Sequence, residues 1–329
     1  GQVATSLAER AATHPGIEVL ALGRPALDLE SPATVEAAIA AARPDLVVNA
    51  AAYTAVDKAE SDSGRAFAAN RDGAAAAARA AARLGVPVIH LSTDYVYPGD
   101  KPSPYVESDA TGPSSVYGQS KLEGEQAVMA AHPQALIFRT SWVYSPFGAN
   151  FVKTMLRIGK DRDVVKVVAD QQGNPTSAID IADAILRLAP GLGSTPAGGI
   201  FHLCGSGSTT WCGLAQAIFA ESGKLGGPAP RVEAITTAEF PTPARRPAFL
   251  SAPPPRGELP MRSHRLRLMG VASVLATLAA APASATEELN ALVWCDHTDP
   301  AFLEPFEKAH DVKVNTKEYE GTGTALALI

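Results

Sequence analysis

A tyrosine and a lysine four residues apart carry the clearest chemical signal in the sequence. Tyr117 and Lys121 lie in the segment VYGQSKLEGE, and on a helix this spacing places both side chains on one face. A phenol with an ordinary pKa of about 10 is a poor acid at neutral pH, and a neighbouring ammonium lowers that pKa because it favours the phenolate. The pair is therefore a candidate general acid for a developing alkoxide, with a chance pair on a solvated helix as the alternative.

A second group of polar residues follows a run that predicts a β-strand. The segment HLSTDYVYPGD places Thr93, Asp94 and Tyr95 at the carboxyl end of this strand. In an open parallel sheet, ligands bind at that edge. We therefore expect these residues to meet the tyrosine–lysine pair in one site.

The segments that must position these residues alternate between short apolar runs and longer alanine-rich runs. Strands that are apolar throughout predict a parallel sheet with both faces covered by helices. The expected fold class is a doubly wound, Rossmann-like α/β fold. Strands are predicted within residues 17–23, 45–51, 86–92, 135–142 and 164–170, and helices within residues 31–43 and 63–85.

Composition narrows the class of protein. The chain has 329 residues, enough for about two domains, and with 46% hydrophobic residues and a net charge of −6 it offers no basic field to hold nucleic acid. Cys204, Cys212 and Cys295 form no disulfide framework and are expected to be reduced. His90 and His202 are isolated within strands, so we expect core or pocket roles and no metal site.

Several motifs in the correct order resemble the dTDP-4-dehydrorhamnose reductase family of extended short-chain dehydrogenases/reductases. They are NAAAYTAVDKAES, STDYVYPGD, VYGQSKLEGE, RTSWVY, NFVKTMLR and FPTPARRPA, all within residues 1–248. The resemblance implies a cytoplasmic enzyme of dTDP-rhamnose biosynthesis that reduces the C4 ketone of dTDP-4-dehydro-L-rhamnose with NADPH or NADH. It implies no membrane or nucleic-acid partner, and because some members dimerise, a homodimer is an option.

The resemblance also assigns roles to the candidate residues. Tyr117 would donate the proton to the C4 oxygen, Lys121 would lower the pKa of Tyr117 and hold the nicotinamide ribose, and Thr93 would hydrogen-bond the same oxygen. Asp94 and Tyr95 would line the sugar site.

Three further residues belong to a sugar-binding part that lies mainly within residues 142–248. Trp142 would pack against the sugar ring, with a pocket-wall or core aromatic as the alternative. Asn174 and Thr176, in QQGNPTS, would line the nucleotide-sugar pocket, with a plain turn as the alternative.

The cofactor site is expected around small residues and one loop. Arg24 could meet a 2′-phosphate, with a solvated arginine as the alternative, and the preceding strand has no acid at its tip, which permits NADPH. The full set that the resemblance implies, besides Tyr117 and Lys121, is Gly1, Arg24, Asp28, Leu29, Ala50, Ala51 and Thr54.

The sequence departs from the family at both ends. Gly1 corresponds to the second glycine of the phosphate-binding turn, so we expect the sheet to lack its first strand and two neighbouring strands to lose their ladder partner. After Ala248 the resemblance stops. Residues 249–260 are a proline-rich linker or frame-shifted segment, residues 261–285 have the layout of a signal peptide, and residues 286–329 resemble the start of a periplasmic polyamine-type solute-binding protein.

We interpret this tail as the poorly folded beginning of a second protein, joined by a change of reading frame or an assembly error, with a true fusion as the alternative. The signal would direct only a separately started protein to the periplasm. For the reductase-like part, the alternatives are a non-catalytic NADP-binding regulatory subunit, a nucleotide-sugar epimerase of the same superfamily, or, for the tail, a secreted polyamine-binding module. The intact Thr93, Tyr117 and Lys121 argue against the regulatory subunit, and Trp142 favours the reductase over the epimerase.

Overall fold

The computed structural model describes residues 1–194, 198–250, 287–293, 312–318 and 325–328. The chain divides into two units, residues 1–257 together with 323–329, and residues 258–322. In the second unit, β12 (Glu287–Val293) and β13 (Val312–Glu318) pair in parallel. The signal-like segment 261–285 lies outside the described residues.

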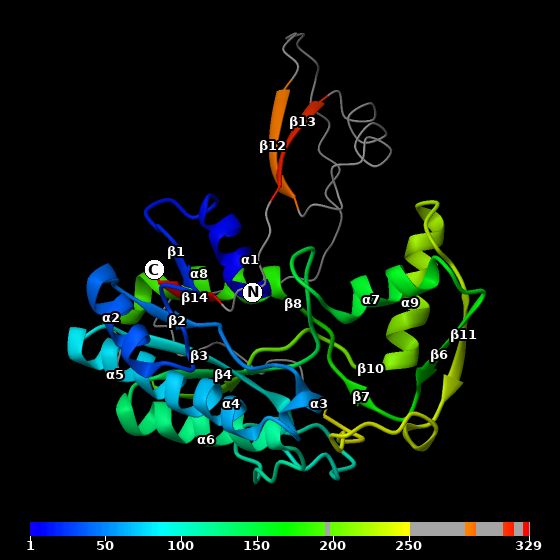
Figure 1. Cartoon of the computed structure of the whole chain (residues 1–329), viewed down its shortest axis with the longest axis horizontal. Helices are drawn as coiled ribbons and strands as arrows, with labels where there is room; N and C mark the ends of the chain where they lie inside the picture. Colours follow the sequence, from blue (N-terminus) through cyan, green and yellow to red (C-terminus); the bar gives the residue numbers. More distant parts are fainter. Residues whose placement is uncertain (195–197, 251–286, 294–311, 319–324, 329) are drawn as a thin grey trace. The chain divides into compact units, whose positions relative to one another are not determined.

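The first unit is built on a six-stranded sheet (Figure 1). Four of its strands pair in parallel, and three of these, which the apolar runs at 45–51, 86–92 and 135–142 predict, are completely buried. This confirms the doubly wound α/β class. In spatial order the strands are β1 (Leu20–Gly23), β14 (Ala325–Leu328), β2 (Val47–Asn49), β3 (Val88–Thr93), β4 (Leu136–Thr140) and β9 (Gly199–His202).

One strand of this sheet comes from the far end of the chain. β14 runs antiparallel to both of its neighbours, pairing with all four residues of β1 and with Val47 and Val48 of β2. The expectation that two neighbouring strands lack a ladder partner is therefore wrong. The backbone groups of β1 and β2 that face each other across this position are paired by β14, which meets the requirement that buried N–H and C=O groups be hydrogen-bonded.

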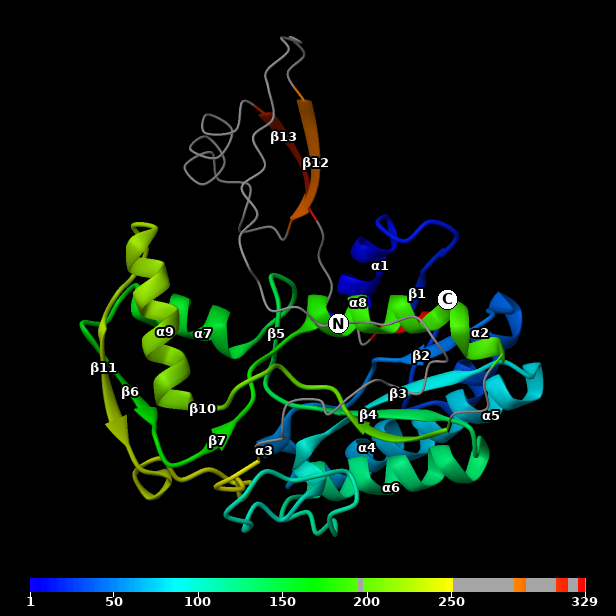
Figure 2. The ribbon, with the colours of Figure 1, turned by 180° about the vertical axis from the view of Figure 1, so that it is seen from behind.

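Helices cover both faces of the sheet (Figures 1 and 2). One core packs under α2 (Pro32–Ala42), α5 (Ala74–Leu84) and α6 (Val116–Ala131), and the other under α1 (Gln2–Ala11) and α8 (Ala178–Leu188). The helix boundaries follow the local sequence signals. Pro32 occupies the first turn of α2, and Gly85 ends α5 in the left-handed conformation (φ 71°).

A smaller layer follows the sheet in the sequence. The run at 164–170 does form a strand, β6 (Val164–Val168), but it pairs in parallel with β11 (Arg231–Ile235) and not with the main sheet. Its apolar residues face α7 (Phe151–Gly159) and α9 (Trp211–Lys224), which form a separate small core with it. The main sheet is completed by β9 instead, a strand that the sequence analysis did not predict.

Short elements connect these layers. Two two-stranded ladders join β5 (Val143–Tyr144) to β8 (Thr176–Ser177) and β7 (Gln172–Gly173) to β10 (Thr209–Thr210). Between β2 and α5 the chain forms α3 (Val56–Ala59), α4 (Ser63–Phe67) and a π-helical segment, η1 (Ala68–Gly73). Three further short segments are 3-10 helices: η2 (Asp94–Val96), η3 (Ala189–Ser194) and η4 (Thr237–Glu239).

A buried ion pair ties α6 to β4. The Arg139 guanidinium donates from Nε and Nη2 to the two carboxylate oxygens of Glu125, at 2.9 and 2.6 Å. Ser92 donates a third hydrogen bond to the same carboxylate at 2.5 Å, and Arg139 also donates to the Tyr97 hydroxyl at 2.6 Å. Because both charges are almost fully shielded from solvent, each depends on the other to offset its loss of hydration.

Removing one charge of this pair should destabilise the folded state. We expect Arg139→Met to lower the free energy of unfolding by about 3–5 kcal/mol, because Glu125 is then left buried without its counter-charge. Arg79→Met is the matched control. Arg79 donates to Glu36 from a half-exposed position, and its loss should cost about 1 kcal/mol or less. Urea denaturation of both variants measures the difference, and equal losses would contradict the prediction.

Candidate functional site

The helix α6 presents Tyr117 and Lys121 to the sheet. Ser115 caps the helix by accepting a hydrogen bond from the Gly118 amide at 3.1 Å. The two side chains are 9% and 2% exposed, and they share the buried face of the helix with Glu125 one turn further on. A side chain at Gly118 would collide with the Tyr95 carbonyl, so a glycine lets the helix approach the strand end this closely.

The structure brings the predicted catalytic residues of strand and helix together. Thr93, at the end of β3, lies close to the Tyr117 phenol and donates to the Asp94 carboxylate at 3.1 Å. The rings of Tyr95 and Tyr117 meet edge to face, with centroids 5.6 Å apart. Four of the residues predicted at the strand end and helix therefore line one site at the carboxyl edge of the sheet.

The electrostatics of Tyr117 differ from the sequence expectation. Burial raises the pKa of Tyr117 to about 12, and the nearby Thr93 hydroxyl opposes this only in part. The expected lowering by the Lys121 ammonium is not observed, because that side chain is engaged elsewhere: Nζ donates to the Leu91 carbonyl at 2.7 Å. Tyr117 is thus held as a neutral phenol with its proton in place at neutral pH.

Lys121 lies beside His90, and the hydrogen bonds of His90 determine which of its ring nitrogens carries the proton. Asn49 accepts from the Ala51 amide through Oδ1, which directs its Nδ2 to donate to Nδ1 of His90 at 3.1 Å. Nε2 of a neutral His90 then carries the proton, and this atom lies 3.4 Å from Lys121 Nζ. Burial lowers the pKa of Lys121 to about 8, and the charge of the Glu125 carboxylate opposes this only in part.

Asp94 is the third titratable group of the site with a shifted pKa. Burial raises the pKa of its carboxyl to about 7, even though Thr93 donates a hydrogen bond to Oδ1. The second oxygen, Oδ2, is buried and has no hydrogen-bond partner among the described residues. Since unpartnered buried acceptors are rare in proteins, Oδ2 is a natural acceptor for a ligand hydroxyl.

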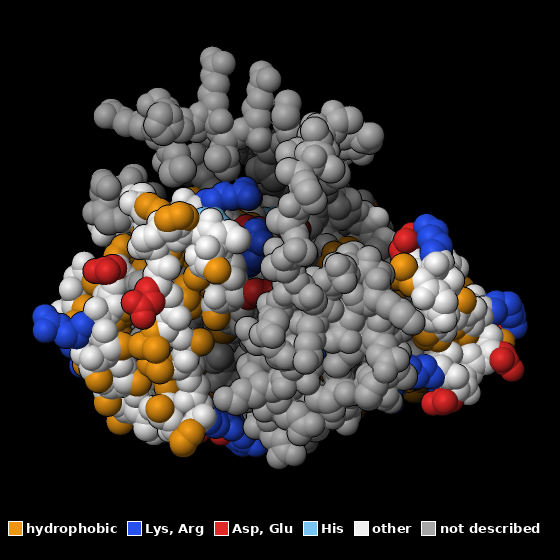
Figure 3. All heavy atoms as spheres, turned by 90° about the horizontal axis from the view of Figure 1, so that it is seen from above, with side chains coloured by type: hydrophobic (Ala, Val, Ile, Leu, Met, Phe, Trp, Pro, Cys, Tyr) orange, Lys and Arg blue, Asp and Glu red, His pale blue; other side chains and the backbone are white. Residues whose placement is uncertain are grey.

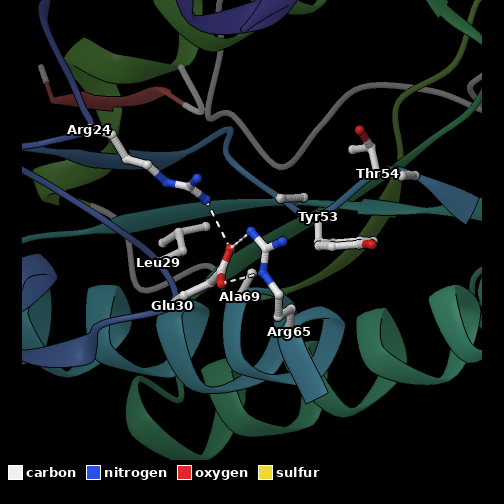
Figure 4. Close-up of a pocket in the computed structure, with 9 residues that line it drawn as sticks. Arg24, Leu29, Glu30, Tyr53, Thr54, Arg65 and Ala69 are labelled. Carbon is white, nitrogen blue, oxygen red and sulfur yellow. Dashed lines mark hydrogen bonds and ion pairs between the residues drawn. The ribbon is translucent and has the colours of Figure 1, made fainter. Parts of the chain in front are cut away.

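The predicted cofactor residues divide into two groups. A cavity of about 170 Å³ at the carboxyl ends of β1 and β2 includes Arg24, Leu29 and Thr54 (Figure 4). Asp28 reaches its edge through an ion pair with Arg24 at 3.2 Å. The others do not line it: Ala51 is part of the core under α2, Ala50 packs on the opposite core, and Gly1 caps α1.

Sequence reasoning did not single out three further residues that line this cavity. Glu30, Tyr53 and Arg65 come from three separate segments, and no local motif connects them. The cavity still suits the adenosine half of a dinucleotide, because Ala52 and Ala55 leave the backbone open and the Glu30 carboxylate can accept from ribose hydroxyls. The residues of this cavity therefore fit a nicotinamide cofactor.

The residues predicted for the sugar site have mainly aromatic and backbone partners. The Trp142 ring stacks on Trp211 with centroids 3.5 Å apart, and Gly173 leaves room for it, since an added Cβ would approach Trp142 to 2.6 Å. Asn174 Nδ2 donates to the carbonyls of Gly205 and Gly207, and Thr176 accepts from the Gly205 amide at 3.1 Å. Asn174 and Thr176 thus hold the loop at residues 205–207.

An ion pair joins the end of the sugar-binding part to the loop after β2. Arg246 donates to both oxygens of Asp57, at 2.8 and 2.7 Å, and lies close to Tyr95. Both partners lie in quoted family motifs, DKAES and PARRPA, but nothing local predicts that they meet. The pair holds the segment around Arg246 against one wall of the site.

Other features of the surface add little to this site. On the face drawn in Figure 3, the visible basic and acidic side chains of the described residues are interspersed. Over the described part of the chain, no helix is long and apolar enough to cross a membrane. Within the same residues, no cluster of His, Cys, Asp or Glu has the arrangement of a metal site.

The lowered pKa of Lys121 predicts that this residue destabilises the fold. We expect Lys121→Met to raise the free energy of unfolding at pH 7 by roughly 1–3 kcal/mol, because a buried ammonium is replaced by an apolar chain of similar length. The penalty is complete below the folded pKa of about 8 and disappears as pH rises toward the ordinary value of 10.5, where the unfolded chain also loses its proton.

The gain should therefore shrink between pH 8 and pH 10 in thermal melts. Lys224→Met, at a solvent-exposed lysine, is the control and should show no such trend. A Lys121→Met variant that is no more stable than the parent at pH 7 would contradict the prediction.

Comparisons with known proteins agree with this geometry. Residues 1–251 match the family model described as RmlD substrate binding domain. The chain is 55% identical over 251 residues to a dTDP-4-dehydrorhamnose reductase of Sinorhizobium fredii, covering 75% of this chain and 84% of that protein, and 46% identical over 225 residues to that of Escherichia coli, covering 67% and 75%.

Solved structures give the same assignment. The Clostridium acetobutylicum dTDP-4-dehydrorhamnose reductase superposes with a TM-score of 0.70 at 37% identity, and the Bacillus anthracis reductase in complex with NADP with 0.70 at 35%. Each comparison covers 77% of this chain and 86% of the other. The chain therefore belongs to the dTDP-4-dehydrorhamnose reductase family, a family of nicotinamide-dependent enzymes with a Rossmann-like fold.

Proposed function

We propose that this chain reduces the C4 ketone of dTDP-4-dehydro-L-rhamnose with NADH or NADPH, giving dTDP-L-rhamnose. The observation that carries the proposal is the close approach of Thr93 and Tyr117 at the carboxyl edge of the sheet, with Lys121 on the same buried helix face. The names of the relatives and their level of identity support the substrate class.

Tyr117 acts as the proton donor in this proposal. Burial keeps its phenol protonated at neutral pH, so a proton is available at Oη when negative charge develops on the C4 oxygen. Thr93 lies close to the phenol, and its hydroxyl, which donates to Asp94 in the structure, turns to the same oxygen. The nicotinamide cofactor supplies the hydride when it is bound.

Lys121 and Asp94 position the two ligands. One of the three ammonium donors of Lys121 is used by the Leu91 carbonyl, which fixes the side chain and leaves other donors for ribose hydroxyls. Asp94 Oδ2 accepts a sugar hydroxyl, which gives this buried oxygen the partner it otherwise lacks. The stacked Trp142 and Trp211 form an aromatic wall that excludes water from the sugar side.

The proton-donor role predicts a large loss of activity in Tyr117→Phe. We expect the rate of NADH or NADPH oxidation with dTDP-4-dehydro-L-rhamnose to fall by a factor of about 10²–10⁴, because the general acid is removed while the ring remains. The assay follows cofactor absorbance, and chromatography identifies dTDP-L-rhamnose. Binding of the cofactor should be nearly unchanged.

Tyr105→Phe is the control for loss of a buried tyrosine hydroxyl. Tyr105 serves the backbone amides of residues 99–101 and lies outside the proposed site, so a folded Tyr105→Phe variant should keep its activity. A folded parent chain that binds cofactor without turnover would favour a regulatory subunit. Conversion of the nucleotide sugar without net oxidation of cofactor would favour an epimerase.

A further inference from the structure

A glutamate bridges the two arginines of the cofactor cavity. Glu30 Oε1 accepts from Arg24 Nη2 at 2.9 Å and from Arg65 Nη2 at 2.8 Å, and its Oε2 accepts from Arg65 Nε at 2.7 Å. Figure 4 shows the two guanidiniums reaching the carboxylate from different sides. Three N–H donors of the two guanidiniums are therefore already used inside the protein, and both positive charges already face a carboxylate.

Acidic groups outnumber basic groups around this cavity. Asp28 also contacts Arg24, at 3.2 Å, and Asp62 lies 3.6 Å from Arg65 and accepts from the Tyr53 hydroxyl. Two guanidiniums thus face three carboxylates. The hydrogen bond from Arg65 lowers the pKa of Glu30, so its carboxylate is fully ionised at neutral pH.

This arrangement bears on the 2′ position of the adenosine ribose. In dinucleotide-binding folds, an acid in this region accepts a hydrogen bond from the 2′-hydroxyl of NAD, and a free arginine accommodates the 2′-phosphate of NADP. A phosphate carries a charge of about −1.5 to −2 at pH 7. Near the ionised Glu30 it would be repelled, and it could reach Arg24 and Arg65 only by displacing that carboxylate.

We propose that Glu30 makes this site select the cofactor without a 2′-phosphate, NADH, by occupying the donors of Arg24 and Arg65 and by accepting a hydrogen bond from the ribose 2′-hydroxyl. The inference rests on the proposed function, because it takes the cavity to be the adenosine site. It reverses the sequence expectation for Arg24, whose guanidinium is committed to Glu30 and Asp28. The selectivity resides in Glu30, which sequence reasoning did not single out.

Calorimetry with two cofactor fragments tests the proposal without any turnover. 5′-AMP and 2′,5′-ADP differ only by the 2′-phosphate, and we expect the parent chain to bind 5′-AMP more tightly. In Glu30→Gln, two guanidiniums lose their carboxylate partner and the cavity loses a negative charge. The ratio of the two dissociation constants should therefore shift toward 2′,5′-ADP by about tenfold or more at low ionic strength.

Glu36→Gln is the matched control. Glu36 also accepts from two arginines, Arg79 and Arg83, but it does not line the cavity, so its replacement should leave the ratio unchanged. Thermal melts verify that each variant is folded. Tighter binding of 2′,5′-ADP by the parent chain, an unchanged ratio in Glu30→Gln, or no binding of either nucleotide would overturn the proposal.

These outcomes are separate from the proposed reductase reaction. A chain that binds 5′-AMP selectively and shows the Glu30→Gln shift, yet does not reduce dTDP-4-dehydro-L-rhamnose, would keep this inference and lose only the proposed substrate. Turnover with a preference for NADPH would keep the reductase and remove the role of Glu30.

Discussion

The buried pair of Glu125 and Arg139 is the constraint on which the site depends. α6 has to place a polar stripe against the sheet, and a stripe of this kind is unfavourable unless each charge finds a partner. Arg139, from the middle of β4, supplies that partner through two hydrogen bonds, and Ser92 of β3 adds a third. With α6 anchored to two adjacent strands, Lys121 is held one turn before the anchor and Tyr117 two turns before it.

Burial then sets the chemistry of the site. It raises the pKa of Tyr117 and of Asp94 and lowers that of Lys121, in each case because the charged form is poorly solvated. For Asp94 and Lys121 this costs stability at neutral pH, since neither has a full counter-charge of its own, whereas Tyr117 is uncharged at that pH in both the folded and the unfolded chain. Such a trade between stability and reactivity is common at catalytic sites, where shifted pKa values match a group to its role.

The parts that could be predicted from the sequence are the local ones. The spacing of Tyr117 and Lys121, the strand end at Thr93 and the apolar runs of β2, β3 and β4 are each set within a few residues, and the structure has them as expected. The raised pKa of Tyr117 was not foreseen, because the spacing shows that the lysine lies nearby but not that its ammonium is directed to the Leu91 carbonyl.

The parts that could not be predicted depend on contacts between distant segments. Arg65 meets Glu30 across 35 positions and Arg246 meets Asp57 across 189, and neither pair leaves a local pattern. The sequence of β6 predicts a strand of the main sheet, but β6 pairs with β11. An apolar run indicates that a strand is buried and does not indicate which strand it pairs with. The pairing of β14 between β1 and β2 is the extreme case, since it joins the two ends of the chain.

Charged groups are arranged differently around Tyr117 and around Glu30, and each arrangement suits the role proposed for that residue. Around Tyr117, the titratable groups are buried with few partners, so burial favours their neutral forms: Tyr117 keeps its proton, the pKa of Asp94 rises and that of Lys121 falls. Around Glu30, the charged groups are partly exposed and paired with one another, so Glu30 stays ionised, and in our proposal it discriminates between ligands by their charge. A proton donor has to hold its proton until charge develops on the substrate, whereas selection between two cofactors needs groups whose charge stays constant. The boundary between the two environments lies along the loop after β2, where Tyr53 faces the cavity and Asp57 binds Arg246 beside Tyr95.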